Sequence, residues 1–340
     1  MTPGLEDAEL RVVLIGCLWA LVQGVFAAQT DADAVKWLQR MATAVKTLNY
    51  RGTFVYIHHK QIEAMRIIHK VDANGERERL VSLNGAAREI IRDQNRLTCI
   101  LPDKKSVVVE KSRSRKIVPE ALLQFLPALK QHYSFKVVGD GRIAGMHTKV
   151  IAVIPKDRYR YGHRLWLDKK TAMLLKSDVV DVKGTIIEQL MFTSLKIVDH
   201  IDDKALQPGV PKTGFKLYQQ LQKPVIQQAP KHWKIGRLPP GYKLKMYAEH
   251  GLPTSKMPVD HYVYTDGLSS VSVYIEKPGK QKKMPLRGLS RMGAVNAFGK
   301  VVDGYQITVV GEVPAATVAL IGKSVRMLSK PAKPGGEPND

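Results

Sequence analysis

The sequence predicts an α+β protein in which a large antiparallel sheet, strongly curved or closed into an open barrel and covered by helices, precedes a smaller α+β domain. Three observations lead to this prediction. The length of 340 residues favours two domains. Short strands with Asn-Gly and Asp-Gly turns recur about every ten residues, without strand–helix alternation. Between two sets of strands, residues 207–232 are rich in Pro, Gln and Lys, which indicates a linker.

The chain begins with a predicted secretory leader, residues 1–27. An apolar run follows Arg11, and Val25 and Ala27 stand where the −3 and −1 residues of a cleavage site stand. The run is shorter than the roughly 20 apolar residues that a bilayer-spanning helix needs. We therefore expect export and cleavage near Ala27.

The first domain, residues 28–206, is predicted to open with an amphipathic helix, since apolar residues recur at helical spacing from Ala34 to Leu48. Strands follow as far as about residue 198. One helix interrupts them over residues 118–133, with a kink at Pro127. The expected hairpin turns include Asn74-Gly75, Asn84-Gly85 and Asp140-Gly141.

The second domain, residues 233–330, is predicted to contain strands over residues 242–250, 259–265, 268–276 and 304–311. Asp266-Gly267 and Asp303-Gly304 are the expected turns. A closing helix should follow, with Pro314 in its first turn and one apolar face made of Val318, Ile321, Val325 and Leu328. The tail, residues 331–340, is predicted to be disordered.

Three histidines lie close together in the sequence, at His58, His59 and His69. They could form a metal or catalytic cluster, but successive side chains of a strand point to opposite faces, so His58 and His59 cannot chelate one ion together. No Cys pair, HExxH motif or carboxylate cluster accompanies them. We therefore interpret them as strand residues and expect no metal.

The strand around residues 54–58 carries apolar or aromatic side chains on both faces, although a sheet with one face in water should alternate. Both faces therefore need cover. Helices packed on a two-sided sheet would supply it, and so would a hollow that accommodates a lipid; the pattern leaves both open.

The chain is strongly basic, with 53 Lys and Arg against 31 Asp and Glu, a net charge of +22 and a pI near 9.9. Such a chain attracts polyanions. Because an exported protein meets no chromosome, anions at a membrane surface are better candidate partners than nucleic acid. Basic stretches at 111–116, 156–164 and 277–283 would by default be solvated charge. In the middle one, however, guanidinium groups along one strand face suit phosphate binding.

No catalytic motif is present: the sequence lacks a G-x-S-x-G elbow, a P-loop, a Rossmann fingerprint and an EF-hand loop. Cys99, the one cysteine outside the leader, lies in a strand-like stretch and is expected to be a buried inert thiol. We expect no catalytic residues and no cofactor.

Residues 28–340 as a whole resemble the MucB/RseB family, periplasmic negative regulators of the envelope-stress sigma factor (sigma-E/AlgU type). The resemblance is carried by "LNYRGTFVYIHH" and "MRIIHKVDANGERERLVSLNGAAREIIRD" in the first domain. In the second it is carried by "LPPGYKL", "VDHYVYTDGLSSVSVYIE", "GAVNAFGKVVDGYQITVVGEVP" and the closing helix.

The resemblance implies a periplasmic protein with a LolA/LolB-like half-barrel that holds a lipid groove, followed by an α+β domain that contacts an anti-sigma factor. Binding would shield the periplasmic part of that membrane-spanning factor from its regulatory protease, and lipopolysaccharide or a related lipid would relieve the block. No catalysis is implied. Whether the chain forms a homo-oligomer stays open.

Three sets of candidate residues follow. For the lipid groove we nominate Phe54, Tyr56, Leu122, Leu126 and Trp166. For an anionic headgroup we nominate Arg113, Arg115, Arg158, Arg160 and Arg164. For partner binding we nominate Tyr262, Tyr264, Tyr274, Arg287 and Arg291, or strand addition at an edge of the second domain.

Rival interpretations are a periplasmic lipid or lipoprotein carrier without a regulatory partner, a nucleic-acid binder and a secreted enzyme. The second domain argues against a simple carrier. The predicted leader and the lack of a recognised motif argue against nucleic acid.

Overall fold

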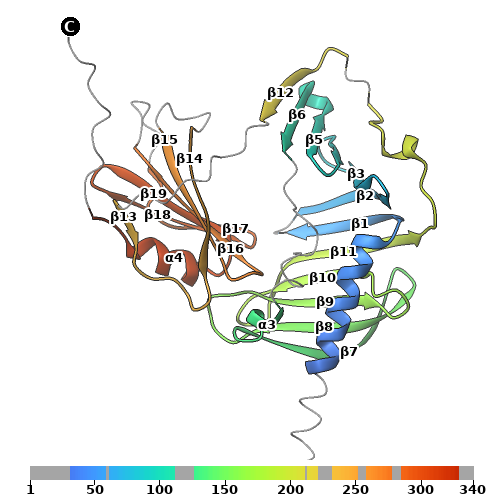
Figure 1. The fold of residues 1–340 in the computed structure, drawn as a ribbon, viewed down its shortest axis with the longest axis horizontal. Helices are drawn as coiled ribbons and strands as arrows, with labels where there is room; N and C mark the ends of the chain where they lie inside the picture. The colour runs from blue at the N-terminus through green and yellow to red at the C-terminus, as the bar shows by residue number, and fades with distance from the viewer. Residues whose placement is uncertain are drawn as a thin grey trace, which may run out of the picture.

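The structure is a computed structural model that describes residues 31–58, 61–111, 126–210, 213–220, 232–251, 258–277 and 285–328. It consists of two β-rich parts, drawn from blue to yellow and from orange to red in Figure 1. The predicted fold class is confirmed, and the large sheet is open. Among the described residues, no helix is long and apolar enough to cross a membrane.

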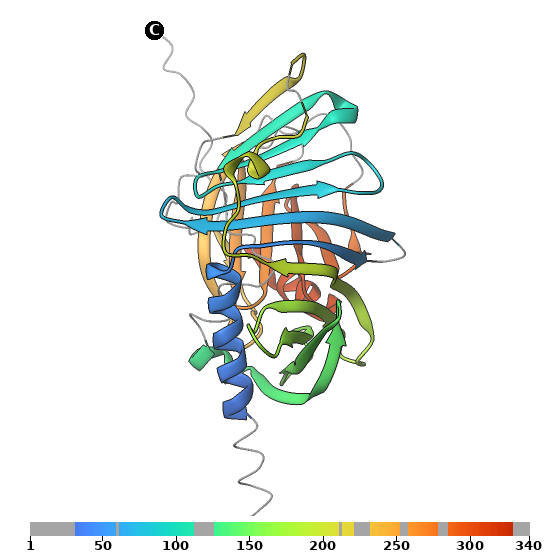
Figure 2. The same ribbon diagram turned by 90° about the vertical axis from the view of Figure 1, so that its right-hand side faces the viewer.

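The first part is built on one large sheet, in which every neighbouring pair except β12–β6 is antiparallel. In spatial order its strands are β12 (Lys216–Gln220), β6 (Ser106–Lys111), β5 (Arg96–Leu101), β4 (Glu89–Arg92), β3 (Gly75–Ser82), β2 (Gln61–Asp72), β1 (Tyr50–His58), β11 (Ile186–Ile197), β10 (Leu174–Val180), β9 (Gly162–Asp168), β8 (Met146–Pro155) and β7 (Tyr133–Ile143). In Figure 2 the green strands β7–β10 curl away from the rest of the sheet.

The N-terminal helix, residues 31–47, lies across the strands from β11 to β7 (Figure 1). Its predicted apolar face is buried, because Leu38 and Met41 pack in one cluster with Ile151 of β8 and Leu165 of β9. Burying such a side chain contributes about 1.5–3 kcal/mol. The helix therefore covers one face of these strands and leaves the other face to be filled differently.

The second part is an antiparallel sheet with one helix packed on it. Its strands, in spatial order, are β14 (Lys243–Gly251), β15 (Pro258–Thr265), β16 (Ser270–Glu276), β19 (Tyr305–Glu312), β18 (Val295–Val302) and β17 (Gly288–Met292). Helix α4 (Ala315–Ser324) buries Val318 and Ile321 against this sheet, as predicted. A two-stranded sheet of β13 (Trp233–Ile235) and β20 (Val325–Met327) completes it.

The end of the chain differs from the prediction. Pro314 is the N-cap of α4 and not part of its first turn. The helix ends at Ser324, and Val325 is extended in β20, where pairing with β13 supplies backbone partners. Leu328 is exposed as a result. The tail, residues 331–340, lies outside the described residues.

Two other sequence predictions need correction. Part of the predicted linker is strand β12, which pairs in parallel with β6 and covers that edge of the large sheet. Asp140-Gly141 lies inside β7, and the turn falls at Ala144-Gly145, where both φ angles are positive. A Cβ at Gly141 would stand 3.1 Å from the Trp166 ring, so this glycine serves close packing of the strand.

Of the second predicted helix, residues 126–133 are described, and residues 112–125 lie outside the described part. Helix α3 (Leu126–Leu129) is shorter than predicted, because residues 130–132 form a turn and Tyr133 already begins β7. Short 3₁₀ turns occupy Pro102–Lys104 and Asp203–Leu206.

Candidate functional site

A cavity of about 720 Å³ opens on strands β8, β9 and β10, on the face that the N-terminal helix does not cover. Alternation along β9 explains its position, because Leu165 and Leu167 face the helix while Trp166 between them faces the cavity. The volume lies within the range of about 300–1,000 Å³ that is usual for small-molecule sites. Its apolar wall is formed by Val138, Val150, Ala152, Ile154, Pro155, Trp166, Val180 and Val182.

The mouth of the cavity is charged. Lys156, Arg158 and Arg164 line it and are exposed, and two carboxylates, Asp157 and Asp181, line it as well. An apolar wall below several exposed cations is a combination that suits an acyl chain with an anionic head.

Two further groups shape this wall. Lys176 places its Nζ 4.2 Å from the centre of the Trp166 ring and 3.3 Å from Asp178, so its charge is stacked and paired. Burial lowers the pKa of His163 to about 4, so its imidazole is neutral at pH 7.

The predicted groove residues do not share one face. Trp166 pairs with Lys176, Lys176 with Met191, and Met191 with Val55, so Trp166 lies on the face of Val55. Phe54, the next residue along β1, therefore faces the other way, where it is buried against core aromatics. Of the nominated groove residues whose side chains the structure describes, Trp166 alone lines the cavity.

Tyr56 lies on the same face as Phe54, and its hydroxyl donates a hydrogen bond to Glu188 at 2.6 Å. Leu122 lies outside the described residues, and so does the side chain of Leu126. The sequence does contain a pattern that indicates the apolar wall of the cavity, and we overlooked it. Residues 150–154 are apolar on both faces, which is the pattern that drew attention to residues 54–58.

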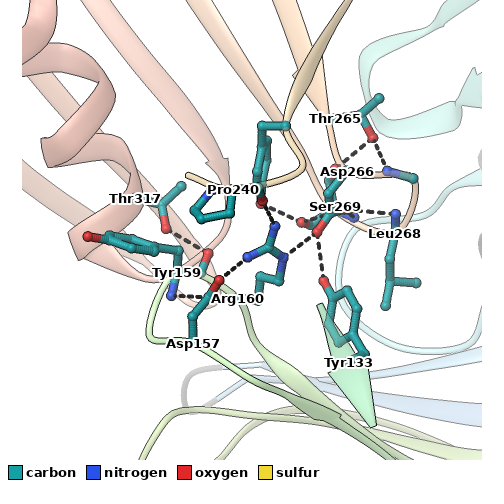
Figure 3. Close-up of polar contacts among 12 residues, drawn as sticks. Tyr133, Asp157, Tyr159, Arg160, Pro240, Thr265, Asp266, Leu268, Ser269 and Thr317 are labelled. Atoms are coloured by element: carbon teal, nitrogen blue, oxygen red, sulfur yellow. Dashed lines mark hydrogen bonds and ion pairs between the residues drawn. The ribbon is translucent and has the colours of Figure 1, made fainter. Parts of the chain in front are cut away.

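Of the headgroup candidates, Arg158 and Arg164 line the cavity, whereas Arg160 does not. Arg160 is completely buried between the two parts of the chain, so it cannot meet a ligand there (Figure 3). Its Nε donates to Asp266 at 2.6 Å, and its two terminal nitrogens donate to Asp157 and to the carbonyl of Pro240. Arg113 and Arg115 lie outside the described residues.

The contact around Arg160 joins the β8–β9 segment to the β15–β16 turn. Asp266 also accepts a hydrogen bond from the Tyr133 hydroxyl at 2.9 Å, and the carbonyl of Tyr159 accepts one from Thr317 at 2.7 Å (Figure 3). Burial alone would lower the pKa of Arg160, but the hydrogen bond and charge of Asp266 raise it overall. This ion pair is therefore charged and shielded from water.

A second contact between the two parts lies at Glu188, in β11. Its carboxylate accepts the Tyr56 hydroxyl and, at 3.0 Å, the backbone N–H of Ala294 in the β17–β18 turn. Nearby, Asn296 donates to the Tyr161 hydroxyl at 2.9 Å. No sequence motif marked Glu188 or Asp266, because each has a partner in the other part of the chain. Asp157 binds Arg160 three residues later, and no motif marked it either.

The nominated partner surface is also revised. Tyr262 and Tyr264 belong to the core of the second part, so their rings offer no surface. Tyr274 is half-buried and stacks on His261 at 4.2 Å. Arg287 and Arg291 are exposed on and beside β17, an edge strand whose five residues are all exposed.

The histidines do not cluster. His69 is buried, with Nδ1 2.9 Å from the carbonyl oxygen of Leu48 and Nε2 3.2 Å from the Glu76 carboxylate, and its ring stacks on Tyr50 at 4.7 Å. His58 pairs with Glu63, while His59 lies outside the described residues. Among the residues that the structure describes, no three His, Cys, Asp or Glu side chains are placed to hold a metal ion. Burial raises the pKa of the Cys99 thiol, so it is not an activated nucleophile.

Comparison with known proteins gives consistent matches over both parts. The model of the MucB/RseB N-terminal domain matches residues 33–210, and that of the MucB/RseB C-terminal domain matches residues 227–326. The sigma factor AlgU regulatory protein MucB of Pseudomonas aeruginosa is 32% identical, over 93% of this chain and 96% of its own. The sigma-E factor regulatory protein RseB of Escherichia coli is 27% identical, over 91% of this chain and 98% of its own.

Solved structures give the same picture. MucB in complex with MucA(peri) matches with a TM-score of 0.67 and 29% identity, over 87% of this chain and all of that one. The MucA/MucB complex of Pseudomonas aeruginosa matches with a TM-score of 0.68 and 31% identity, over 88% of this chain and all of that one.

Proposed function

Because the chain belongs to the MucB/RseB family, we propose that it binds the periplasmic part of a membrane-spanning anti-sigma factor and thereby restrains an envelope-stress sigma factor. The similarity to MucB in its solved complexes with MucA is the observation that carries this proposal, since it extends over both parts of the chain. The role is one of regulated binding, without catalysis.

In the finer proposal, binding protects the anti-sigma factor from regulated proteolysis, and lipopolysaccharide or a related lipid reverses the protection. The action belongs to the periplasm, after removal of the predicted leader, residues 1–27. For the partner we retain Arg287 and Arg291 beside the open edge of β17, where an extended segment could add a strand.

The cavity on β8–β10 is the proposed lipid site. Its apolar wall would bury an acyl chain, at about 0.8 kcal/mol for each CH₂ group removed from water. Lys156, Arg158 and Arg164 at the mouth would attract phosphate groups on the lipid. The lipid site is thus separate from the partner surface on β17.

Titration calorimetry of the purified chain with the periplasmic fragment of its anti-sigma factor, with and without lipopolysaccharide, tests the proposal. We expect tight binding of the fragment that lipopolysaccharide weakens. Binding of lipopolysaccharide without binding of the fragment would favour the carrier interpretation instead.

A matched pair of variants tests the cavity. Ile154→Glu places a carboxylate in the wall at a residue that is 40% exposed, so it should fold and lose lipopolysaccharide affinity about tenfold or more while keeping partner affinity. Ile62→Glu, at a strand residue that is 57% exposed and outside the cavity, is the control. Equal lipopolysaccharide affinity in both variants would remove the cavity from the proposal.

A further inference from the structure

We propose that residues 156–164 couple the cavity to the contact between the two parts of the chain, so that an acyl chain with an anionic head bound in the cavity opens that contact. This inference rests on the proposed function in taking such a lipid as the ligand. It adds the segment through which the cavity acts on the second part of the chain. It also adds the residues that hold the two parts in contact, which we call the closed arrangement; in the open arrangement this contact is broken.

The segment has two sides with different partners. On one side it lines the cavity with Lys156, Asp157, Arg158, Gly162, His163 and Arg164. On the other side its middle residues contact the second part of the chain. Arg160 donates a hydrogen bond to Asp266, and the carbonyl of Tyr159 accepts one from the Thr317 hydroxyl. The Tyr161 hydroxyl accepts one from the side-chain amide of Asn296. One short stretch is therefore both cavity wall and interface.

Asp157 belongs to both sides. The residue lines the cavity. Its carboxylate accepts the backbone N–H of Tyr159 at 2.9 Å and binds the Arg160 guanidinium (Figure 3). An anionic head held by Arg158 and Arg164 would stand beside this carboxylate and repel it. Displacement of Asp157 takes away one of the two carboxylates that neutralise the buried Arg160.

The wall of the cavity is closely packed around Gly162. A Cβ added at Gly162 would stand 2.9 Å from Val180 and 3.2 Å from the carbonyl of Val153, so the backbone here is already in close contact with its neighbours. An acyl chain that needs more room must move the segment outward, because packed interiors shift between discrete arrangements.

The opposite wall leads to the same interface. Val180, Asp181, Val182 and Gly184 of the β10–β11 hairpin line the cavity, and Glu188 a few residues later binds the N–H of Ala294. Both walls thus end on the second part of the chain. Occupation of the cavity acts on two contacts together, which favours opening as a single event.

Linkage fixes what must be measured. If the ligand binds the open arrangement more tightly, a substitution that opens the contact must raise ligand affinity, and such couplings typically amount to about 5–150-fold. The arrangement is followed by the distance between spin labels at Lys136→Cys in β7 and Arg326→Cys in β20, both exposed, with Cys17 and Cys99 replaced by Ser. Dodecyl phosphate, one alkyl chain with one phosphate, is the probe.

Three variants are compared with the parent chain. Asp266→Asn removes the buried countercharge of Arg160, and Thr317→Val is a milder change that removes one hydrogen bond to Tyr159. Asp140→Asn is the control, because Asp140 forms an exposed ion pair with Lys149 on β7–β8 and does not line the cavity.

We expect dodecyl phosphate to lengthen the label distance in the parent and in Asp140→Asn. In Asp266→Asn the long distance should be present without the probe, and affinity for the probe should rise at least fivefold. Thr317→Val should change both quantities in the same direction by less.

Two results would overturn the inference, and they differ in their consequence for the lipid site of the proposed function. If the probe binds the parent but the distance stays constant and Asp266→Asn binds it no better, the cavity remains a lipid site and the coupling is wrong. If the parent does not bind the probe at all, the lipid site of the proposed function fails, and the coupling fails with it.

Discussion

Arg160 carries its charge where water cannot reach it, and this burial determines what its ion pair with Asp266 contributes to the closed arrangement. Removing both ions from water costs several kcal/mol each, which their attraction and the surrounding hydrogen bonds roughly repay. The pair therefore adds little net stability to the closed arrangement. It makes half-open arrangements costly, because one ion without the other would be buried and unpaired.

His163 makes stability depend on pH. Its pKa is about 4 in the folded chain and about 6.5 when unfolded, so below pH 6.5 the unfolded chain binds more protons. Stability from this residue is fully present above pH 6.5 and is lost as the pH falls toward 4, by roughly 3 kcal/mol.

Urea unfolding of the parent and of His163→Gln between pH 7.5 and 4.5 measures this contribution. The variant should lose distinctly less stability over that interval than the parent. His147→Gln, at an exposed strand residue, is the control and should follow the parent. If all three chains lose stability in parallel, His163 does not titrate as described.

At the scale of elements, the presence of most strands and helices could be predicted from the sequence, whereas the close packing of one strand against another could not. Asp303-Gly304 forms its predicted turn, with positive φ at both residues, since local geometry demands it. Asp140-Gly141 has the same letters but lies within β7, because the Trp166 ring from β9 needs the space over Gly141. That requirement comes from a residue 25 positions away and leaves no local signal.

Gly141→Ala tests this explanation. The added methyl would meet Thr148 and the Trp166 ring at about 3.1 Å, so we expect a loss of about 1–3 kcal/mol of stability and a shifted Trp166 ring. In a Trp166→Phe background the smaller ring leaves room, and the loss should shrink. A loss that is the same in both backgrounds would show that the ring does not impose the glycine.

The candidate site was predictable in kind and only partly in its residues. Lys156, Arg158 and Arg164 of the basic stretch line the cavity together with Trp166, and cationic and aromatic residue types can be recognised in a sequence. Phe54 lies on the opposite face from Trp166 and is buried, and nothing local in the sequence tells which of two apolar faces is the core. Arg160 was misassigned because its partner, Asp266, comes from the other part of the chain.

At the scale of the whole molecule, the net charge of +22 attracts any anionic surface from a distance, whereas specific recognition needs cations placed at the cavity. Long-range attraction and specific recognition can be distinguished if we compare substitutions that remove the same amount of charge at different places. Arg158→Gln with Arg164→Gln removes two charges at the mouth, and Arg142→Gln with Lys196→Gln removes two exposed charges elsewhere in the same sheet.

We expect the first pair to weaken lipopolysaccharide binding about tenfold at 50 mM NaCl and to flatten its dependence on salt, because the charges closest to the ligand contribute most. The second pair should weaken binding by less than about threefold and keep the salt dependence of the parent. Lipopolysaccharide titrations at salt concentrations from about 50 to 500 mM, where the screening length falls from beyond 10 Å to a few ångströms, provide the comparison. Equal losses in the two pairs would mean that net charge alone, and not the mouth of the cavity, attracts the lipid.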